Sequence, residues 1–92
     1  MTAKMPLWRP DVRYRKQLGG RVILVKGVDV YQLDEVSNLI WGLCDGKHTM
    51  QEIADAIVAE YDVDSDVALQ DCQAFLDDLT QADLITWESH EL

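Results

Sequence analysis

The sequence predicts an α+β fold in which a three-stranded antiparallel sheet is followed by three helices. Short β-branched runs separated by glycines fill residues 12–33, a pattern typical of strands joined by tight turns. From residue 34 onward the apolar residues recur with the 3.6-residue period of amphipathic helices. At 92 residues, the chain has the length of one ordinary domain with a single core.

Residues 12–18 and 21–25 form the first two predicted strands, and Gly19-Gly20 between them tolerates the positive φ angles of a two-residue hairpin turn. Lys26-Gly27 separates the second strand from a third predicted strand at residues 28–33, which is rich in strand formers. We expect the three strands to form an antiparallel meander. Residues 1–10 are expected to form a loose, flexible N-terminal segment, as chain termini commonly do.

Asp34 can cap the first predicted helix, whose apolar face repeats at Val36, Leu39, Ile40 and Leu43. The helix is expected to end at Asp45-Gly46, because glycine suits the left-handed residue that follows a helix. Thr49 and Glu52 form a capping box that opens a second helix. The apolar stripe of this second helix consists of Met50, Ile53, Ala54, Ile57, Val58 and Tyr61.

Several Asp residues at positions 62–66 can cap a third helix. Its apolar residues fall within about 100° of one another around the helix axis, and they are Ala68, Leu69, Cys72, Phe75, Leu76 and Leu79. Residues 84–87 then predict a short closing strand, or an extended segment packed on the core, before a polar tail at residues 88–92. We therefore expect one domain at residues 11–87.

Charge is divided unevenly along the chain, whose formal net charge is −9. Residues 1–47 hold eight Lys and Arg against five Asp and Glu, a net charge of +3, whereas residues 48–92 hold twelve acidic residues and no Lys or Arg. An acidic chain is a poor nucleic-acid binder, because such binding depends on neutralising phosphates. The longest apolar stretch is far short of the ~20 residues of a membrane span, and no signal peptide is evident, so a cytoplasmic protein is expected.

The residue types that carry catalysis or bind metals are poorly placed in this sequence. His48 lies in a predicted turn and His90 in the polar tail, so neither is positioned beside a nucleophile. Cys44 and Cys72 lack a CxxC partner and are expected to be buried thiols. The acidic run at residues 62–66 lacks the glycine and distal Glu of a calcium loop. We expect no catalytic residue, no metal site and no cofactor.

The sequence pattern bears on two classes of binding protein, a carrier protein and a DNA-binding winged helix. Ser65 lies in an Asp-Ser-Asp-Val context, which differs from the Asp-Ser-Leu of a carrier protein. Three short strands with a helix-turn-helix resemble a winged helix, whose usual task is to read DNA with a basic helix. The third helix instead carries exposed acids at Asp66, Asp71, Asp77 and Asp78. The alternative function is a DNA-binding regulator. Its contacts with DNA would come from basic strand residues, which are Arg13, Arg15, Lys16 and Arg21.

The third predicted strand is suited to receive another strand. Residues 28–33 contain no Pro and no Lys, and their one charge is Asp29, so nothing blunts this strand if it lies at a sheet edge. A peptide added at such an edge pairs through its main chain and seats alternate side chains in apolar surroundings. The third helix is the element expected to supply those surroundings.

A set of ordered short motifs resembles the PqqD-like family over residues 12–85. The motifs are Val30-Tyr31-Gln32-Leu33-Asp34, Ile40-Trp41-Gly42-Leu43, Asp45-Gly46, Thr49 with Ile53, and Phe75-Leu76 before Leu79 and Leu84-Ile85. The resemblance implies a compact winged-helix-like domain. It also implies a stand-alone RiPP recognition element, a non-catalytic adaptor that binds the leader of a ribosomally made precursor peptide and presents it to a maturation enzyme such as a radical-SAM enzyme or a leader peptidase.

The resemblance further implies where the leader binds. Family members capture it as an antiparallel strand on the third strand, in the cleft beside the third helix. Carried onto this sequence, the peptide-binding residues are Val28, Asp29, Val30, Tyr31, Gln32, Leu33, Leu69, Cys72, Gln73, Phe75 and Leu76. Neither a nucleic acid nor a membrane is an expected partner, and nothing in the sequence selects the class of peptide product.

Overall fold

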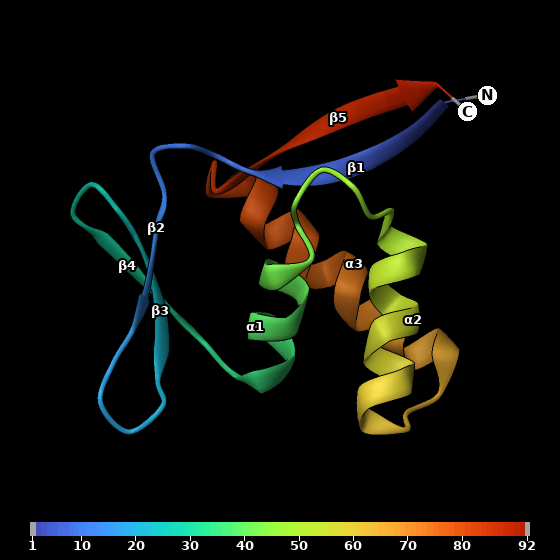
Figure 1. The fold of residues 1–92 in the computed structure, drawn as a ribbon, viewed down its shortest axis with the longest axis horizontal. Helices are drawn as coiled ribbons and strands as arrows, with labels where there is room; N and C mark the ends of the chain where they lie inside the picture. Colours follow the sequence, from blue (N-terminus) through green and yellow to red (C-terminus); the bar gives the residue numbers. More distant parts are fainter. Residues whose placement is uncertain (1, 92) are drawn as a thin grey trace.

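The computed structural model describes residues 2–91 of the chain. Its elements are β1 (Thr2–Trp8), β2 (Arg13–Lys16), β3 (Val22–Lys26), β4 (Asp29–Leu33), α1 (Glu35–Gly42), α2 (Met50–Tyr61), α3 (Ser65–Gln81) and β5 (Ile85–Glu91). Strands β2, β3 and β4 form an antiparallel sheet in that order, whereas β1 and β5 form a separate two-stranded sheet (Figure 1). The predicted α+β fold, with a three-stranded antiparallel sheet followed by three helices, is confirmed.

The two ends of the chain differ from the sequence prediction. Residues 1–10 were expected to be loose, but Thr2–Trp8 form β1 and pair antiparallel with β5. The closing strand also extends through residue 91, so most of the expected polar tail at 88–92 is strand. The ladder joins residues about 80 positions apart, and such long-range pairing leaves no local signal in residues 2–8, whereas the start of β5 was predicted from residues 84–87. Strands β1 and β5 thus extend beyond the predicted domain of residues 11–87.

Strand β1 is also bonded to the segment that follows α1. The Trp8 N–H donates to the Cys44 carbonyl at 3.0 Å, and the Gly46 N–H donates to the Pro6 carbonyl at 2.9 Å. These bonds take residues 44–46 out of the helix, so α1 ends at Gly42 instead of at Asp45-Gly46. Gly46 has a φ of +77°, and a Cβ there would lie 3.3 Å from a Leu7 methyl group. Both facts favour glycine at this position.

The hairpin loops set the register of the three-stranded sheet. The Gly20 N–H donates to the Gln17 carbonyl, and Gln17 pairs with Arg21, so the first loop has three residues, 18–20, and not the two that were predicted. Lys26 pairs directly with Asp29, which makes residues 27–28 a two-residue loop. Val28, expected in the third strand, therefore lies in this loop and is 98% exposed.

The core lies between the inner face of the three-stranded sheet, the three helices and the start of β5. Its buried apolar residues are Val22, Leu24, Leu33, Ile40, Trp41, Cys44, Ile53, Ala54, Ile57, Ala68, Cys72, Leu76, Leu79, Leu84 and Ile85. The predicted caps position the first two helices: Asp34 accepts from the Ser37 N–H, and Thr49 with Glu52 forms the complete capping box. Burial of each large apolar side chain stabilises the fold by about 1.5–3 kcal/mol.

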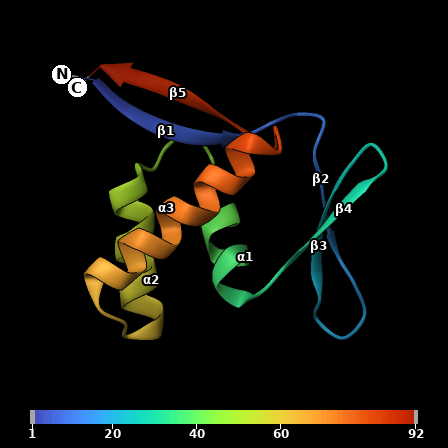
Figure 2. The ribbon, with the colours of Figure 1, turned by 180° about the vertical axis from the view of Figure 1, so that it is seen from behind.

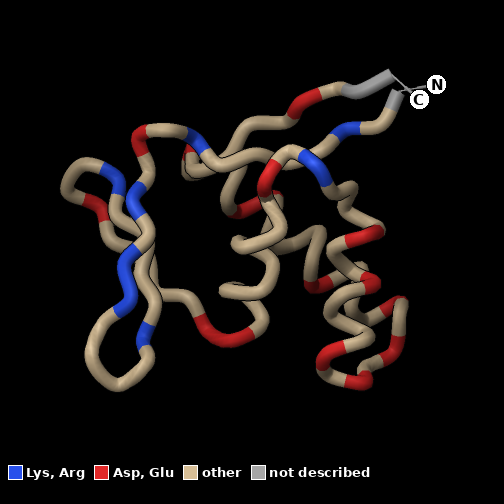
Figure 3. The backbone as a smooth tube through the Cα atoms, viewed as in Figure 1, with Lys and Arg blue, Asp and Glu red and all other residues tan. Residues whose placement is uncertain are grey.

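The charges are separated in space as well as in sequence. Figure 3 shows Lys and Arg gathered along the β2–β3 end of the molecule and Asp and Glu spread over the helices. In the part of the chain that the structure describes, no helix is long and apolar enough to cross a membrane.

Candidate functional site

Strand β4 forms one edge of the three-stranded sheet, since the strand order is β2-β3-β4. Among residues 2–91 no strand pairs with its outer side. The opposite edge, β2, carries Arg13, Arg15 and Lys16 on four exposed residues, and such charges blunt an edge. Strand β4 has only Asp29 as a charged residue, so it is the edge that is open to another strand.

The hydrogen-bond alternation of the sheet identifies which main-chain groups of β4 face outward. The Gln17 N–H donates to the Arg21 carbonyl at 2.7 Å, so Arg21 and every second residue after it bond to β2. The intervening residues of β3 bond to their partners in β4, which are Asp29, Tyr31 and Leu33. Val30 and Gln32 therefore direct their N–H and C=O groups to the open edge.

The side chains of β4 alternate between two environments. Val30 is 61% exposed and Gln32 is exposed, whereas Leu33 is buried in the core and Tyr31 is half-buried against it. A strand added at this edge would place every second side chain on the same face as Tyr31. That face is the one turned toward the helices.

Helix α3 presents two different margins on either side of its buried stripe. Gln73 and Phe75 lie about 160° apart around the helix, at 3.6 residues per turn, so they cannot line the same groove. Thr80, close to Gln73 around the axis, accepts a hydrogen bond from the Trp87 indole of β5 at 2.9 Å. The margin of Gln73 therefore faces β5, which runs above α3 in Figure 2, with the three-stranded sheet to the right. Phe75 lies on the other margin of the buried stripe.

Two acidic residues share the margin of Phe75 and were not among the predicted contacts. Asp71 precedes Phe75 by four residues and Asp78 follows it by three, spacings that place all three on one helical face. Both acids are exposed and Phe75 is half-buried. The helical spacing was visible in the sequence, but the exposure of each residue was not.

A hydrogen bond ties the sheet to the segment that follows α3. The Lys26 ammonium group donates to the Asp83 carbonyl at 2.6 Å and lies 3.7 Å from the Asp11 carboxylate. This contact brings the β3–β4 hairpin to the C-terminal end of α3.

Other predicted contact residues have different positions. Cys72 and Leu76 are 0% exposed, so their side chains present no surface to a peptide and form part of the core instead. Leu33 is likewise buried, and Leu69 is half-buried near the margin that carries Gln73. Of the predicted contact residues in β4, Val30, Tyr31 and Gln32 are exposed or half-buried at the open edge, and Phe75 of α3 is half-buried.

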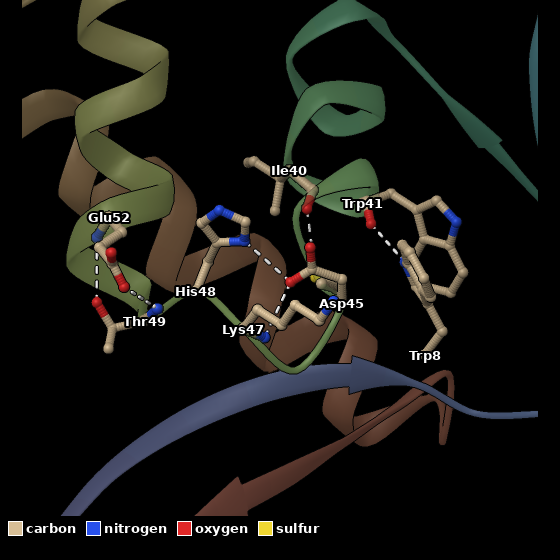
Figure 4. A network of polar contacts seen from close by, with 9 residues as sticks. Trp8, Ile40, Trp41, Asp45, Lys47, His48, Thr49 and Glu52 are labelled. Carbon is tan, nitrogen blue, oxygen red and sulfur yellow. Dashed lines mark hydrogen bonds and ion pairs between the residues drawn. The ribbon is translucent and has the colours of Figure 1, made fainter. Parts of the chain in front are cut away.

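The titratable groups with shifted pKa values at Cys44, Cys72 and Asp45 are either buried thiols or a carboxylate held in hydrogen bonds. Burial raises the pKa of the Cys44 thiol to about 12, with Cys72 and Asp45 adding to the effect, and raises that of Cys72 to about 11. Partial burial by itself raises the pKa of Asp45, but hydrogen bonds from His48 and from the Lys47 N–H, with the His48 charge, bring it below its ordinary value (Figure 4). Among the described residues no cluster of three His, Cys, Asp or Glu could hold a metal ion.

Three solved structures share this fold. A lasso peptide synthetase B1 complexed with its leader peptide is 22% identical, with a TM-score of 0.77, and the match covers 88% of this chain and 96% of that one. TbiB1 in complex with the TbiA(beta) leader peptide is 30% identical, with a TM-score of 0.74 and coverage of 86% and 93%.

A third structure is the PqqD truncation of Methylobacterium extorquens PqqCD, described as a functional and stand-alone RiPP recognition element. It is 24% identical, with a TM-score of 0.74, and the match covers 88% of this chain and 87% of that one. No curated protein matches the sequence. A family profile described as coenzyme PQQ synthesis protein D (PqqD) matches residues 21–85. This match confirms the resemblance inferred from the sequence motifs, and the chain belongs to the PqqD family.

Proposed function

We propose that this protein is a non-catalytic, peptide-binding adaptor. It captures the leader of a ribosomally synthesised precursor peptide by strand addition to β4 and presents the peptide to a maturation enzyme. The observation that carries this proposal is the unblunted edge of β4, where Val30 and Gln32 direct main-chain groups outward. The leader-bound state of two solved relatives supports the same assignment.

Main-chain pairing would supply the affinity at this edge. An antiparallel leader strand would exchange hydrogen bonds with Val30 and with Gln32, the pattern of peptide binding by β-augmentation. One or two apolar leader side chains would then rest on the face formed by Tyr31 of β4 and Phe75 of α3. Leader residues beyond those contacts would meet the carboxylates of Asp71 and Asp78, which favour Lys or Arg.

The adaptor role requires a second protein, a maturation enzyme that acts on the captured precursor. Radical-SAM enzymes and leader peptidases are the candidate classes. The genes that neighbour the gene for this chain are where to look for the precursor and the enzyme with which to test the proposal.

The direct test replaces the outward main-chain donor of Val30. Val30→Pro removes that N–H and places a ring at the open edge, a change that edge strands tolerate. We expect leader affinity to fall by at least about tenfold, because a hydrogen bond worth about 0.5–1.5 kcal/mol is lost and the ring obstructs pairing. The matched control is Val30→Thr, which keeps the N–H and the branched shape and should bind within about twofold of the parent protein. Titration calorimetry with the synthetic leader measures all three affinities.

Asp29→Pro is a useful contrast, because Asp29 pairs with Lys26 inside the hairpin. This substitution should lower the stability of the sheet, whereas Val30→Pro should leave the melting temperature nearly unchanged. Equal leader affinity in the parent protein and in a folded Val30→Pro variant would refute strand addition at β4.

A further inference from the structure

A pocket of about 570 Å³ lies on the other side of the sheet from β4, between the β1–β2 connection, strand β2 and helix α1. Its walls are mainly apolar, formed by Trp8, Pro10, Val12, Tyr14 and Trp41. Trp8 is 37% exposed and Tyr14 is 46% exposed, so the pocket opens to solvent. Its volume falls within the range of about 300–1,000 Å³ that is usual for ligand pockets.

The pocket is rigidly built. The Trp8 indole N–H donates to the Trp41 carbonyl, and the two indole rings lie 6.2 Å apart between centroids at 43° (Figure 4). The Tyr14 hydroxyl donates to the Asn38 side chain at 3.0 Å, which joins β2 to α1 across the pocket. Rigid aromatic side chains that need little further ordering are typical anchors at protein interfaces.

The charge around this pocket is opposite to that beside β4. Arg9 lines it, and no lining residue is acidic. The Arg9 Nε is buried without a hydrogen-bond partner among the described residues and forms an ion pair with Asp11, at 3.7 Å. On strand β2 the exposed Lys16 lies on the same face as Tyr14, whereas Arg13 and Arg15 lie on the opposite face. A carboxylate entering the pocket would therefore be attracted by Arg9 and Lys16, whereas the cationic leader proposed for the Asp71 and Asp78 side would be repelled.

We infer that this pocket docks the maturation enzyme, through a segment in which a bulky apolar side chain is flanked by Asp or Glu. The inference rests on the proposed adaptor function and extends it. The two surfaces select partners of opposite charge at opposite edges of one sheet. Leader and enzyme can thus be bound at the same time without competing for β4.

The first test follows the three tryptophans of the intact protein. Trp8 and Trp41 line the pocket, whereas Trp87 lies on β5 and bonds to Thr80, so it serves as an internal control. The protein is labelled at the indole nitrogens and titrated with a radical-SAM enzyme or leader peptidase identified from the neighbouring genes, without leader. We expect the signals of Trp8 and Trp41 to shift or broaden first and that of Trp87 to follow only with the overall increase in size.

The second test separates the two surfaces with substitutions. Tyr14→Glu and Arg9→Glu should each weaken enzyme binding at least tenfold while changing leader affinity less than twofold. Lys4→Glu, which makes the same charge change as Arg9→Glu on β1 away from the pocket, should change enzyme affinity less than threefold. Val30→Pro should show the reverse pattern, with leader binding lost and enzyme binding kept. Circular dichroism confirms that each variant is folded.

Several outcomes would overturn the inference. Unchanged enzyme affinity in folded Tyr14→Glu and Arg9→Glu variants would exclude the pocket, as would enzyme-induced shifts confined to Trp87. Loss of leader binding in these two variants would show that the leader itself extends into the pocket. Failure of the parent protein to bind the leader at all would count against the proposed function instead, so the two failures can be told apart.

Discussion

Cys44 and Cys72 are both fully buried, and burial raises the pKa values of their thiols to about 12 and about 11. The thiolate is the reactive form of cysteine. At about pH 8, where a free cysteine is partly ionised, we expect neither thiol to react with iodoacetamide in the folded protein, and both to react in urea. Mass spectrometry of the alkylated protein measures this. Modification of either cysteine under native conditions would contradict the buried assignment.

The Asp45 carboxylate stabilises the α1–α2 connection through hydrogen bonds with the His48 ring and the Lys47 N–H. The pKa of Asp45 is lower in the folded protein than in the unfolded chain, where it is about 3.9. The carboxylate therefore stabilises the fold fully at pH values above the unfolded-state pKa, and this contribution is lost as the pH falls through the folded-state pKa. Asp45→Asn should therefore cost up to about 1 kcal/mol at neutral pH and almost nothing in acid.

Urea titrations at neutral and acidic pH measure the difference between the parent protein and the Asp45→Asn variant. Asp77→Asn, a change at an exposed acid on α3, is the control. A difference that grows as the pH falls would contradict the stated sign of the Asp45 contribution.

At the scale of elements, the contact between α1 and β1 is the one least apparent from local pattern. Trp41 of α1 is 5% exposed and packs on Trp8 of β1. Trp41→Ala should lower the free energy of unfolding by about 3–5 kcal/mol, the usual cost of truncating a large buried aromatic residue. Trp8→Ala should cost less, because Trp8 is 37% exposed. Urea unfolding measures both variants, and equal costs would contradict the burial difference.

At the scale of the whole molecule, the separation of charge predicts how association depends on salt. A leader with basic flanks is attracted to the acidic helices, so its association rate should fall at least about threefold between low and high salt. Stopped-flow fluorescence with a labelled leader measures the rate. A short DNA duplex should not bind at low salt, where counterion release would favour it most. A gel shift with DNA would support the alternative function, a DNA-binding regulator with a winged-helix fold.

Helix caps and strand-forming runs were predictable from the sequence because they are local. Asp34, Thr49 and Glu52 cap the helices as their spacing indicated, and the strand-forming run of residues 28–33 contains the observed β4. The family could also be inferred, since its motifs lie in order along the chain. Alternation and helical period depend on neighbours within a few residues, which a single sequence displays directly.

Only the tertiary structure decided which of those residues are accessible. The sequence did not distinguish the apolar residues of α3 from one another, but Cys72 and Leu76 are buried in the core while Phe75 remains half-buried at the margin of the stripe. Likewise, Thr2–Trp8 become a strand only because β5 and residues 44–46 bond to them. Burial and strand pairing depend on partners distant in sequence, so neither the exposure of each α3 residue nor the Trp8–Trp41 pocket could be derived from local pattern.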